Sequence, residues 1–446
     1  MVHRRQAAIG TAAAITMAVA GGFVRAADSP AGTAPASRPA VTAIRPDLEA
    51  DPKVLAILDG LGENESALLP PVRTAGAINE EQKKFRLDKV GPRPRNYCLK
   101  WVWAPDRKRA MFCGANAGVP HRFNDVWEYD LAANTWICLW EPDPDIQKTR
   151  GWDKPKRYEY IEKMAHVKDG VLMTKRGAPF DPVHTWWGMT YDPDIKAVLW
   201  VVAVRRKASP ALEAANKVDS RKMKLWAYYP EQNRWEFQPQ TASSPPCQNA
   251  SNLDYIPDLH GAVWYTSSSR GHAMSVFNAK SRTWLQLLPS SKIKDNADCP
   301  RLGCSSAYDS KNQVLVAYKG QPARDGRPAL CCTHHYDVRT NTWKKVIESA
   351  VGPLGGSSGG PMTYDSVAKR CFILSAKNGL WSYGVGDKAW SETRPDGPRP
   401  VISRSNRYMF CYNPQYNVLM ADNGSGRAWV YRARQRAAAV GPPSAE

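Results

Sequence analysis

This chain contains the kinds of side chain that elimination chemistry on an acidic sugar polymer requires. Such cleavage needs a base for the proton beside the carboxylate, an acid for the leaving oxygen and an arginine that neutralises the carboxylate. The candidates for these roles are, in turn, His121, His184 and His272, then Tyr158, Tyr160 and Tyr191, and then Arg122, Arg205 and Arg206. No local motif ranks them, so His121, His184 and Tyr191 are candidates and not a catalytic set.

Each of these residues also has a purely structural alternative. Tyr191 belongs to a pattern that recurs along the chain, which favours a structural role. A single histidine in a loop is more often a surface residue than a base. The sequence therefore offers residue types for catalysis without showing that catalysis takes place.

Arginine and histidine recur in segments that should form loops. An arginine binds carboxylate or sulfate through two parallel hydrogen bonds. If these loops converge, the residues expected to bind an anionic ligand are Arg122, Arg205, Arg206, Arg270, His272 and Arg404. The alternative is that each arginine pairs with its own carboxylate and the charge is ordinary solvated surface.

A spaced pair of aromatic residues indicates the strands that would position these loops. An aromatic residue is followed seven positions later by tryptophan at Tyr129/Trp136, Tyr228/Trp235, Phe277/Trp284, Tyr336/Trp343 and Tyr383/Trp390. Self-similarity at a period of roughly 40 to 50 residues is typical of β-propellers, whose units must stack to bury their apolar faces. These tryptophans should therefore be buried between blades.

A second marker has the same period. An aromatic residue comes before a turn rich in Pro, Asp, Asn or Ser, and an apolar strand follows; the markers begin at Trp103, Tyr191, Tyr255, Tyr308, Tyr364 and Tyr412. This pattern predicts a hairpin between the first two strands of a unit. The Tyr/Trp pair predicts the hairpin between strands three and four. Two hairpins per unit give a four-stranded antiparallel blade.

At these residues the chain resembles the secreted bacterial kelch-repeat, galactose-oxidase-like propellers. The resemblance lies in the spaced Tyr and Trp and covers about residues 83 to 434. The chain departs from the pattern in the glycine pair after the second strand, where only Gly114 and Gly320 stand, each alone. The resemblance implies an all-β kelch-like β-propeller. The resemblance says little about the substrate, because β-propellers have many unrelated functions.

Six first-hairpin markers predict six four-stranded blades, with seven as the alternative. A seventh blade could lie in residues 140–172, but that stretch is highly charged and lacks both markers, which favours an insertion with a short helix. The last blade has no fourth-strand Trp before the chain ends. Phe85 to Val90 is predicted to supply the missing strand, so that an N-terminal strand closes the ring and covers its open edge.

The N-terminal residues indicate export. Residues 1–26 combine a basic start, an apolar run and a small-residue cleavage site, as in a signal peptide. Arg4-Arg5 leaves twin-arginine export open, and a membrane anchor is a further alternative. Residues 27–50 read as a disordered Ala/Pro/Ser linker, 51–82 as a short helix and lead-in, 83–434 as the propeller and 435–446 as a disordered tail. The expected location is periplasmic or extracellular, without stable membrane insertion.

Ten cysteines in an exported chain favour disulfides. Cys98 and Cys113 flank one hairpin, while Cys299 and Cys304 could pair with each other or with Cys331 or Cys332. No zinc-like spacing is present. The sequence therefore predicts no metal site and no cofactor. Copper-radical oxidation, known in galactose oxidase, finds no matching local motif here.

The charge of +19 predicts an anionic partner. For an exported protein, an acidic polysaccharide or a cell-envelope glycan is a more natural ligand than nucleic acid. The leading hypothesis is recognition of an anionic carbohydrate at the face where the loops between strands two and three, and between blades, emerge. The alternatives are an enzyme on the same substrate class, a polysaccharide lyase or a sugar-acid isomerase or mutarotase, and a protein-interaction scaffold. Oligomeric state is left open.

Overall fold

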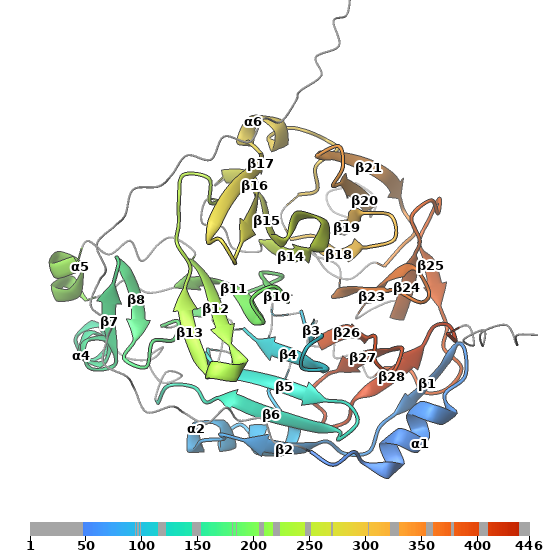
Figure 1. Cartoon of the computed structure of the whole chain (residues 1–446), viewed down its shortest axis with the longest axis horizontal. Helices are drawn as coiled ribbons and strands as arrows, with labels where there is room; N and C mark the ends of the chain where they lie inside the picture. The colour runs from blue at the N-terminus through green and yellow to red at the C-terminus, as the bar shows by residue number, and fades with distance from the viewer. Residues whose placement is uncertain are drawn as a thin grey trace, which may run out of the picture. The chain divides into compact units, whose positions relative to one another are not determined.

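The computed structural model describes residues 48–93, 95, 98, 100–114, 122–144, 153–180, 182–183, 185–204, 209–216, 224–245, 251–268, 271–301, 303–321, 330–353, 360–375, 379–400 and 409–436. They belong to one compact unit, Thr42–Glu446. Six sheets surround a common axis as the blades of a β-propeller (Figure 1). The prediction of a six-bladed propeller is confirmed.

The blades follow one another along the chain, and the first strand of each lies nearest the axis (Figure 1). The first three blades contain β3 (Val102–Ala104), β4 (Arg109–Cys113), β5 (Val126–Asp130) and β6 (Thr135–Trp140); β10 (Met189–Asp192), β11 (Ala197–Val204), β12 (Lys224–Tyr229) and β13 (Arg234–Phe237); and β14 (Asn252–Ile256), β15 (Gly261–Ser268), β16 (Gly271–Asn278) and β17 (Thr283–Leu288). The last three contain β18 (Ser305–Asp309), β19 (Val314–Gln321), β20 (Leu330–Asp337) and β21 (Thr342–Ser349); β22 (Met362–Asp365), β23 (Arg370–Ser375), β24 (Gly379–Tyr383) and β25 (Ser391–Thr393); and β26 (Met409–Asn413), β27 (Val418–Asp422), β28 (Trp429–Arg432) and β1 (Glu65–Leu68).

The first hairpin of every blade has the same backbone turn. The fifth residue after the marker aromatic adopts the left-handed conformation, with φ between 45° and 57°, at Lys108, Lys196, His260, Gln313, Lys369 and Asn417. A residue with positive φ after a tight turn lets the two strands keep their twist. The sequence marker therefore corresponds to a specific turn geometry.

The second hairpin has a related device built on asparagine. Asn134 accepts a hydrogen bond at its Oδ1 from the hydroxyl of Tyr129, at 2.6 Å. The same bond joins Tyr228 to Asn233 and Tyr336 to Asn341, each at 2.7 Å. All three asparagines have positive φ. Asparagine tolerates this conformation better than most residues, which explains its place five residues after the tyrosine.

The ring is closed by an N-terminal strand, but not by the one expected. β1 pairs antiparallel with β28, with Glu65 opposite Arg432 and Leu68 opposite Trp429. Asn64, with φ of 61°, accepts from the hydroxyl of Tyr431 at 2.9 Å, so the asparagine device is completed from the opposite end of the chain. The prediction that residues 85–90 form this strand is wrong.

Phe85 lies instead between two short helices, α2 (Glu80–Lys83) and α3 (Leu87–Val90). A capping box between Asn79 and Gln82 begins α2, which commits this segment to helical structure. The ring of Phe85 packs edge-on against Phe123, with centroids 5.8 Å apart. Upstream, β2 (Arg73–Gly76) adds a parallel fifth strand outside β6.

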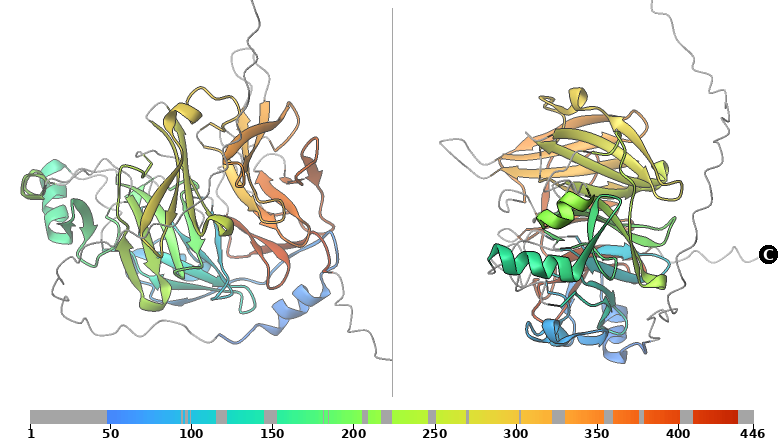
Figure 2. Two further views of the ribbon diagram at one scale, coloured as in Figure 1. Left: turned by 45° about the horizontal axis from the view of Figure 1, so that its top comes forward. Right: turned by 90° about the vertical axis from the view of Figure 1, so that its left-hand side faces the viewer.

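Helices and one extra hairpin lie at the rim of the ring (Figures 1 and 2). They are α1 (Pro52–Gly60), α4 (Lys154–Met164), β7 (Ala165–Lys168), β8 (Val171–Thr174), α5 (Pro210–Asn216) and α6 (Ser290–Ile293). Within the blades, β9 (Pro182–Val183) pairs with β11, and η2 (Pro230–Gln232) and η3 (Pro257–Leu259) form hairpin turns in blades 2 and 3. The insertion after blade 1 thus contains α4 and the β7–β8 hairpin, which pack together around Ile161, Leu172 and Phe180. It is an insertion with a helix, as predicted, rather than a seventh blade.

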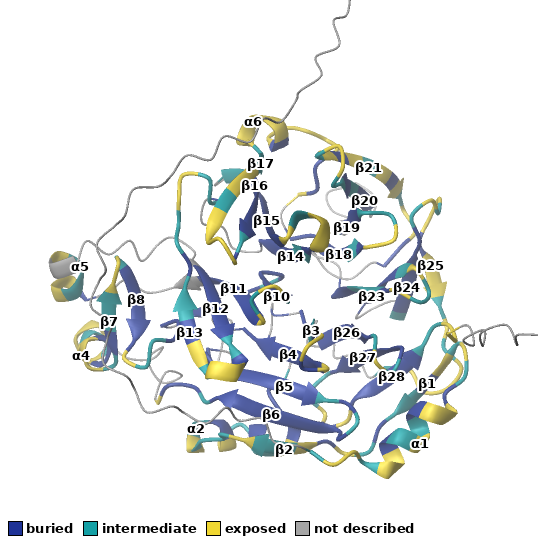
Figure 3. Ribbon diagram, in the orientation of Figure 1, coloured by how far each residue is buried: buried dark blue, intermediate teal, exposed yellow. Residues whose placement is uncertain are grey.

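Apolar side chains fill the space between neighbouring blades, and the outermost strands are the most exposed (Figure 3). Trp136, Trp235, Trp343 and Trp390 of the repeat are buried, which confirms their predicted packing role. Trp284 is half-buried and packs against the cluster between blades 2 and 3. Within the described residues, no helix is long and apolar enough to cross a membrane.

Candidate functional site

A polar network crosses the ring axis near the loop ends of the inner strands. Lys100 precedes β3 in blade 1, and its Nζ donates to the carbonyl of Leu253 and to Asp254 Oδ1 in blade 3, each at 2.5 Å. Ser306 of blade 4 donates to the other carboxylate oxygen of Asp254, also at 2.5 Å. Because blade 2 separates blades 1 and 3, Lys100 ties together blades that are not neighbours. We call Lys100, Asn252, Asp254 and Ser306 the axial network.

A second lysine approaches the same network from blade 4. Lys319 donates from Nζ to the carbonyl of Gly303 at 3.1 Å. The next residue, Cys304, has a carbonyl that accepts from Asn252 at 2.9 Å. Burial lowers the pKa of Lys319. Burial also raises the pKa of Cys304 to about 12, although the nearby charges of Lys319 and Lys100 oppose the rise. The charges of two ammonium groups, from Lys100 and Lys319, thus act on one buried thiol, Cys304.

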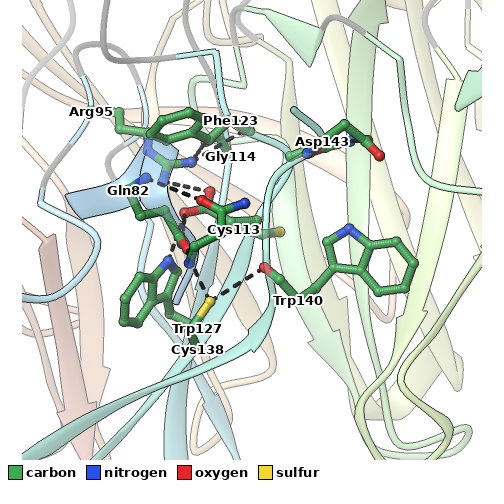
Figure 4. Close-up of polar contacts among 12 residues, drawn as sticks. Gln82, Arg95, Cys113, Gly114, Phe123, Trp127, Cys138, Trp140 and Asp143 are labelled. Carbon is green, nitrogen blue, oxygen red and sulfur yellow. Dashed lines mark hydrogen bonds and ion pairs between the residues drawn. The ribbon is translucent and has the colours of Figure 1, made fainter. Parts of the chain in front are cut away.

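Arg95 is the centre of a buried cluster at the loop end of blade 1 (Figure 4). Its guanidinium donates to the carbonyls of Gly114 and Phe123, at 2.5 and 3.3 Å, and to Asp125 Oδ1 at 2.5 Å. The second oxygen of Asp125 accepts from Trp127 Nε1 at 2.7 Å. Arg95 and Asp125 are both buried, so the pair shapes this loop rather than exposing a free charge.

The N-terminal lead-in is attached to this cluster through Gln82. Its Nε2 lies 3.2 Å from Asp125 Oδ2 and 3.3 Å from Cys138 Sγ (Figure 4). Gln82 is fully buried and also caps α2. The geometry of the loop face at blade 1 therefore depends on a helix that precedes the first blade in sequence.

Beside this cluster lies Asp143, a buried carboxyl at the start of the insertion (Figure 4). Its Oδ2 accepts from Asn124 at 2.6 Å, and its backbone N–H donates back to Asn124 Oδ1 at 3.2 Å. Arg176 lies 3.8 Å from Oδ1, and its guanidinium lies 4.3 Å from the ring centroid of Trp140. Burial raises the pKa of Asp143, while the Asn124 hydrogen bond opposes the rise.

The residues predicted to bind the ligand are only partly within the described structure. Arg122 is buried at the loop end of blade 1, next to the Arg95 cluster in sequence. His272 is the second residue of β16, at the loop end of blade 3, with Nδ1 3.4 Å from Ser267 Oγ. Six of the predicted residues lie outside the described residues: His121, His184, Arg205, Arg206, Arg270 and Arg404.

Tyr191 lies at the first hairpin of blade 2, at the end of the blade opposite the loop face, and its contacts there are structural. Its hydroxyl donates to Asp106 Oδ1 in the first hairpin of blade 1, at 2.5 Å. Tyr255 donates in the same way to Asp194 at 2.8 Å, and Tyr308 donates to Asp258. Burial raises the pKa of Tyr191, and the Asp106 hydrogen bond adds to this effect. These three first-hairpin tyrosines thus link blades 2, 3 and 4 each to the blade before it.

Sequence reasoning did not find the axial network. Lys100 and Asp254 are 154 positions apart in the chain, and neither belongs to a motif. Asp254 and Ser306 do share a signal, because Asp254 comes one residue before the marker Tyr255 and Ser306 comes two residues before the marker Tyr308. Polar residues at these inner-strand positions could have pointed to the axis.

The nine described cysteines are all free and buried, so the expected disulfides do not occur among them. Cys247 lies outside the described residues. Cys331 contacts the hydroxyl of Tyr318 at 2.9 Å rather than a second sulfur. In the part of the chain that the structure describes, no group of three His, Cys, Asp or Glu side chains could hold a metal ion.

The sequence matches no protein-family profile and no curated protein. Among solved structures, an oligogalacturonate lyase in complex with manganese is 12% identical, with a TM-score of 0.39, and the match covers 76% of this chain and 89% of that one. A mitotic checkpoint complex is 10% identical, with a TM-score of 0.37 and coverage of 94% and 100%. Similarity at this level carries no inference about activity.

Proposed function

We propose that this protein is an exported, kelch-type propeller that recognises an anionic carbohydrate at its loop face. The observation that supports this most is at the ring axis, where Lys100 pairs with Asp254 and the charges of Lys100 and Lys319 both act on buried Cys304. Burial disfavours the charged form of Lys319, so an incoming carboxylate or sulfate would gain from stabilising it. The ring brings together residues from three blades at this point.

The basic composition and the N-terminal segment support the rest of the proposal. A net charge of +19 favours association with an acidic polysaccharide or cell-envelope glycan. The basic and apolar start of the chain resembles a signal peptide, which supports a periplasmic or extracellular location. The spaced Tyr and Trp support membership of the kelch type.

An enzyme on the same substrate class is the second candidate, and Asp143 is the observation that favours it. A buried carboxyl with a raised pKa beside an arginine is a common arrangement for proton transfer. Elimination from a uronic-acid chain would use such a group to take or give a proton, with Arg176 close by to hold the substrate carboxylate.

Calorimetric titration of the purified protein with an oligogalacturonate and with a neutral oligosaccharide tests the proposal. We expect the acidic oligosaccharide to bind and the neutral one to be indifferent. Lys319→Gln should weaken acidic-oligosaccharide binding by about 1.5–3 kcal/mol, the usual loss for a hydrogen bond to a charged group. Lys280→Gln, at an exposed lysine in the second hairpin of blade 3, is the matched control and should bind normally.

The same samples separate the candidate functions. New ultraviolet absorbance from an unsaturated uronic product would favour the lyase, and its loss in Asp143→Asn would implicate that carboxyl. Binding without product supports recognition. If neither binding nor product is observed, the loop-face proposal is overturned and a scaffold that binds other proteins is favoured. Arg205→Ala with Arg206→Ala tests the predicted loop arginines in the same assay.

A further inference from the structure

Blade 5 departs from the tyrosine–asparagine device at its second hairpin. Tyr383 occupies the tyrosine position, but the fifth residue after it is Lys388 and the turn between contains Gly384 and Gly386. The Tyr383 hydroxyl is instead 3.0 Å from Nε2 of His335, which belongs to β20 of blade 4. The hydrogen bond that serves one blade elsewhere therefore joins two blades here.

The same histidine borders a cavity of about 420 Å³ between blades 4 and 5, on the hairpin side of the ring. We call it the blade 4–5 groove. His335 lines it together with Val346 and Val385. Val346 is the extra residue of a bulge in β21 and is one of the exposed large apolar side chains. A volume of this size is within the range of small-molecule sites.

The charged residues that line the groove are mostly basic. They are Lys311, Arg339, Lys344 and Asp337. The one carboxylate, Asp337, is engaged by Arg339 at 2.8 Å. Among the described residues no carboxylate forms an ion pair with Lys311 or Lys344, and the side chain of Lys344 is exposed on β21. The ammonium groups of Lys311 and Lys344 are therefore available to bind an anion.

His335 adds an uncharged polar group to the groove. Burial lowers its pKa to about 4, and the charges of His334 and Lys344 act in the same direction, while Asp309 opposes them. The imidazole is therefore neutral at pH 7. A neutral ring whose Nε2 is engaged by Tyr383 has a fixed orientation and can hydrogen-bond a ligand hydroxyl through its other nitrogen.

We propose that the blade 4–5 groove is a binding site for a sugar-sized molecule that carries an oxyanion. Lys311 and Lys344 bind the oxyanion, and the oriented His335 binds a hydroxyl group. Tyr383 is a positioning residue, because it acts on the ligand through His335. This site lies on the hairpin side of the ring and does not depend on the loop-face function.

The test uses the full chain labelled with ¹³C in its histidines, titrated with glucose 6-phosphate, glucuronate and glucose at constant ionic strength. His335→Gln identifies the His335 signal. We expect that signal to shift saturably with a phosphate sugar, a carboxylate sugar or both, and the response tells which oxyanion the groove takes. Glucose should leave it unchanged. The proposal is overturned if neither charged sugar shifts the signal, or if glucose shifts it equally.

Variants assign the response to the groove. Lys311→Gln with Lys344→Gln should raise the Kd about tenfold or more, as loss of charged hydrogen bonds predicts. Lys294→Gln, at an exposed lysine after α6, should not change it. Lys319→Gln should also leave the His335 response intact, which separates this site from the loop face. An unchanged Kd in the double lysine variant would refute the proposal.

The role of Tyr383 is tested by a matched pair. Tyr383→Phe removes the hydroxyl that orients His335 and should raise the Kd severalfold. Tyr336→Phe removes the equivalent hydroxyl of blade 4, which bonds to Asn341 within its own hairpin. It should lower the melting temperature without changing the Kd. Equal effects of both variants on the Kd would show that Tyr383 has only a structural role.

Discussion

Asp422 is a buried carboxyl that joins the last blade to the first. Its Oδ2 accepts from Trp136 Nε1 at 3.0 Å, and its Oδ1 accepts from the backbone N–H of Gly424 at 2.6 Å. Burial raises its pKa to about 6, although these hydrogen bonds oppose the rise. Asp192 has the same property, with burial raising its pKa to about 6. These carboxyls make stability depend on pH in a specific direction.

Between about pH 4 and pH 6 the folded protein holds a proton on Asp422 that the unfolded chain has released. The stabilisation from this proton is complete below the unfolded pKa and is lost as pH rises through the folded value. For Asp422 the loss is about 3 kcal/mol between pH 4 and pH 7. Asp422→Asn should flatten this part of the profile of melting temperature against pH. An unchanged slope would show that Asp422 ionises normally.

Tyr191 provides a test between a structural and a catalytic role. Tyr191→Phe removes the hydrogen bond to Asp106, which is exposed and stays solvated, so we expect a loss of about 0.5–1.5 kcal/mol in the free energy of unfolding. Ligand binding and any lyase activity should be unchanged, because the hydroxyl faces the neighbouring hairpin. Loss of activity at normal stability would contradict the structural role.

At the scale of elements, Asn64 should be as important to blade 6 as Asn341 is to blade 4. Each has positive φ and accepts from the tyrosine of its blade. Asn64→Ala and Asn341→Ala should each cost about 2–4 kcal/mol, from a lost hydrogen bond to a buried hydroxyl and from strain at positive φ. Denaturant unfolding measures both. Closure by β1 would be unimportant if only Asn341→Ala destabilised the protein.

The repeated tryptophans offer a graded comparison. Trp343 is buried and packs against Tyr265 and Tyr336, with ring centroids 5.2 and 5.4 Å away. Trp343→Ala should cost about 3–5 kcal/mol. Trp284 is half-buried, so Trp284→Ala should cost less. A melting temperature of Trp343→Ala within a degree or two of wild type would exclude the packing role.

The strands that flank a repeated turn could be predicted from the sequence. The closing strand β1 could not, because its copy of the repeat lacks the tryptophan. In β1 the Asn-Thr-Trp sequence of blades 1 and 4 becomes Asn64-Glu65-Ser66, and Ser66 donates to the carbonyl of Pro398 at 2.7 Å instead of packing between blades. The asparagine was a usable signal. Phe85 was matched to the tryptophan position because KKFRLDKVGP resembles KKVIESAVGP, which follows Trp343, and the capping box at Asn79 argued against a strand there.

At the scale of the whole molecule, the ring explains why the site was harder to predict than the fold. The residues of a hairpin are close together in the sequence, so a short segment is enough to predict one. Lys100 meets Asp254 only because the ring brings non-adjacent blades to one axis. The loop-face surface was predicted as a class of residues, and Arg122 proved to be buried. Removal of Arg122 should therefore reduce stability as well as any binding.

Deletion of residues 1–70 tests closure in the whole molecule. It removes β1 and leaves β28 as an unpaired edge. We expect a loss of several kcal/mol and concentration-dependent association, because exposed edges pair with other chains. Light scattering and thermal melting measure the two effects. A truncated protein that stays monomeric and melts like the full chain would show that the ring does not need β1.

Closure by β1 also determines the order of events during synthesis. Glu65 pairs with Arg432, so β1, the first strand of the ring to be synthesised, can pair only after β28, the last one, has been made. Until the C-terminal strand is complete, the other five blades can form while β1 has no partner. Contacts between such distant residues form slowly. A newly made chain therefore passes through a stage with an open seam, in which a β1 from another copy competes with its own.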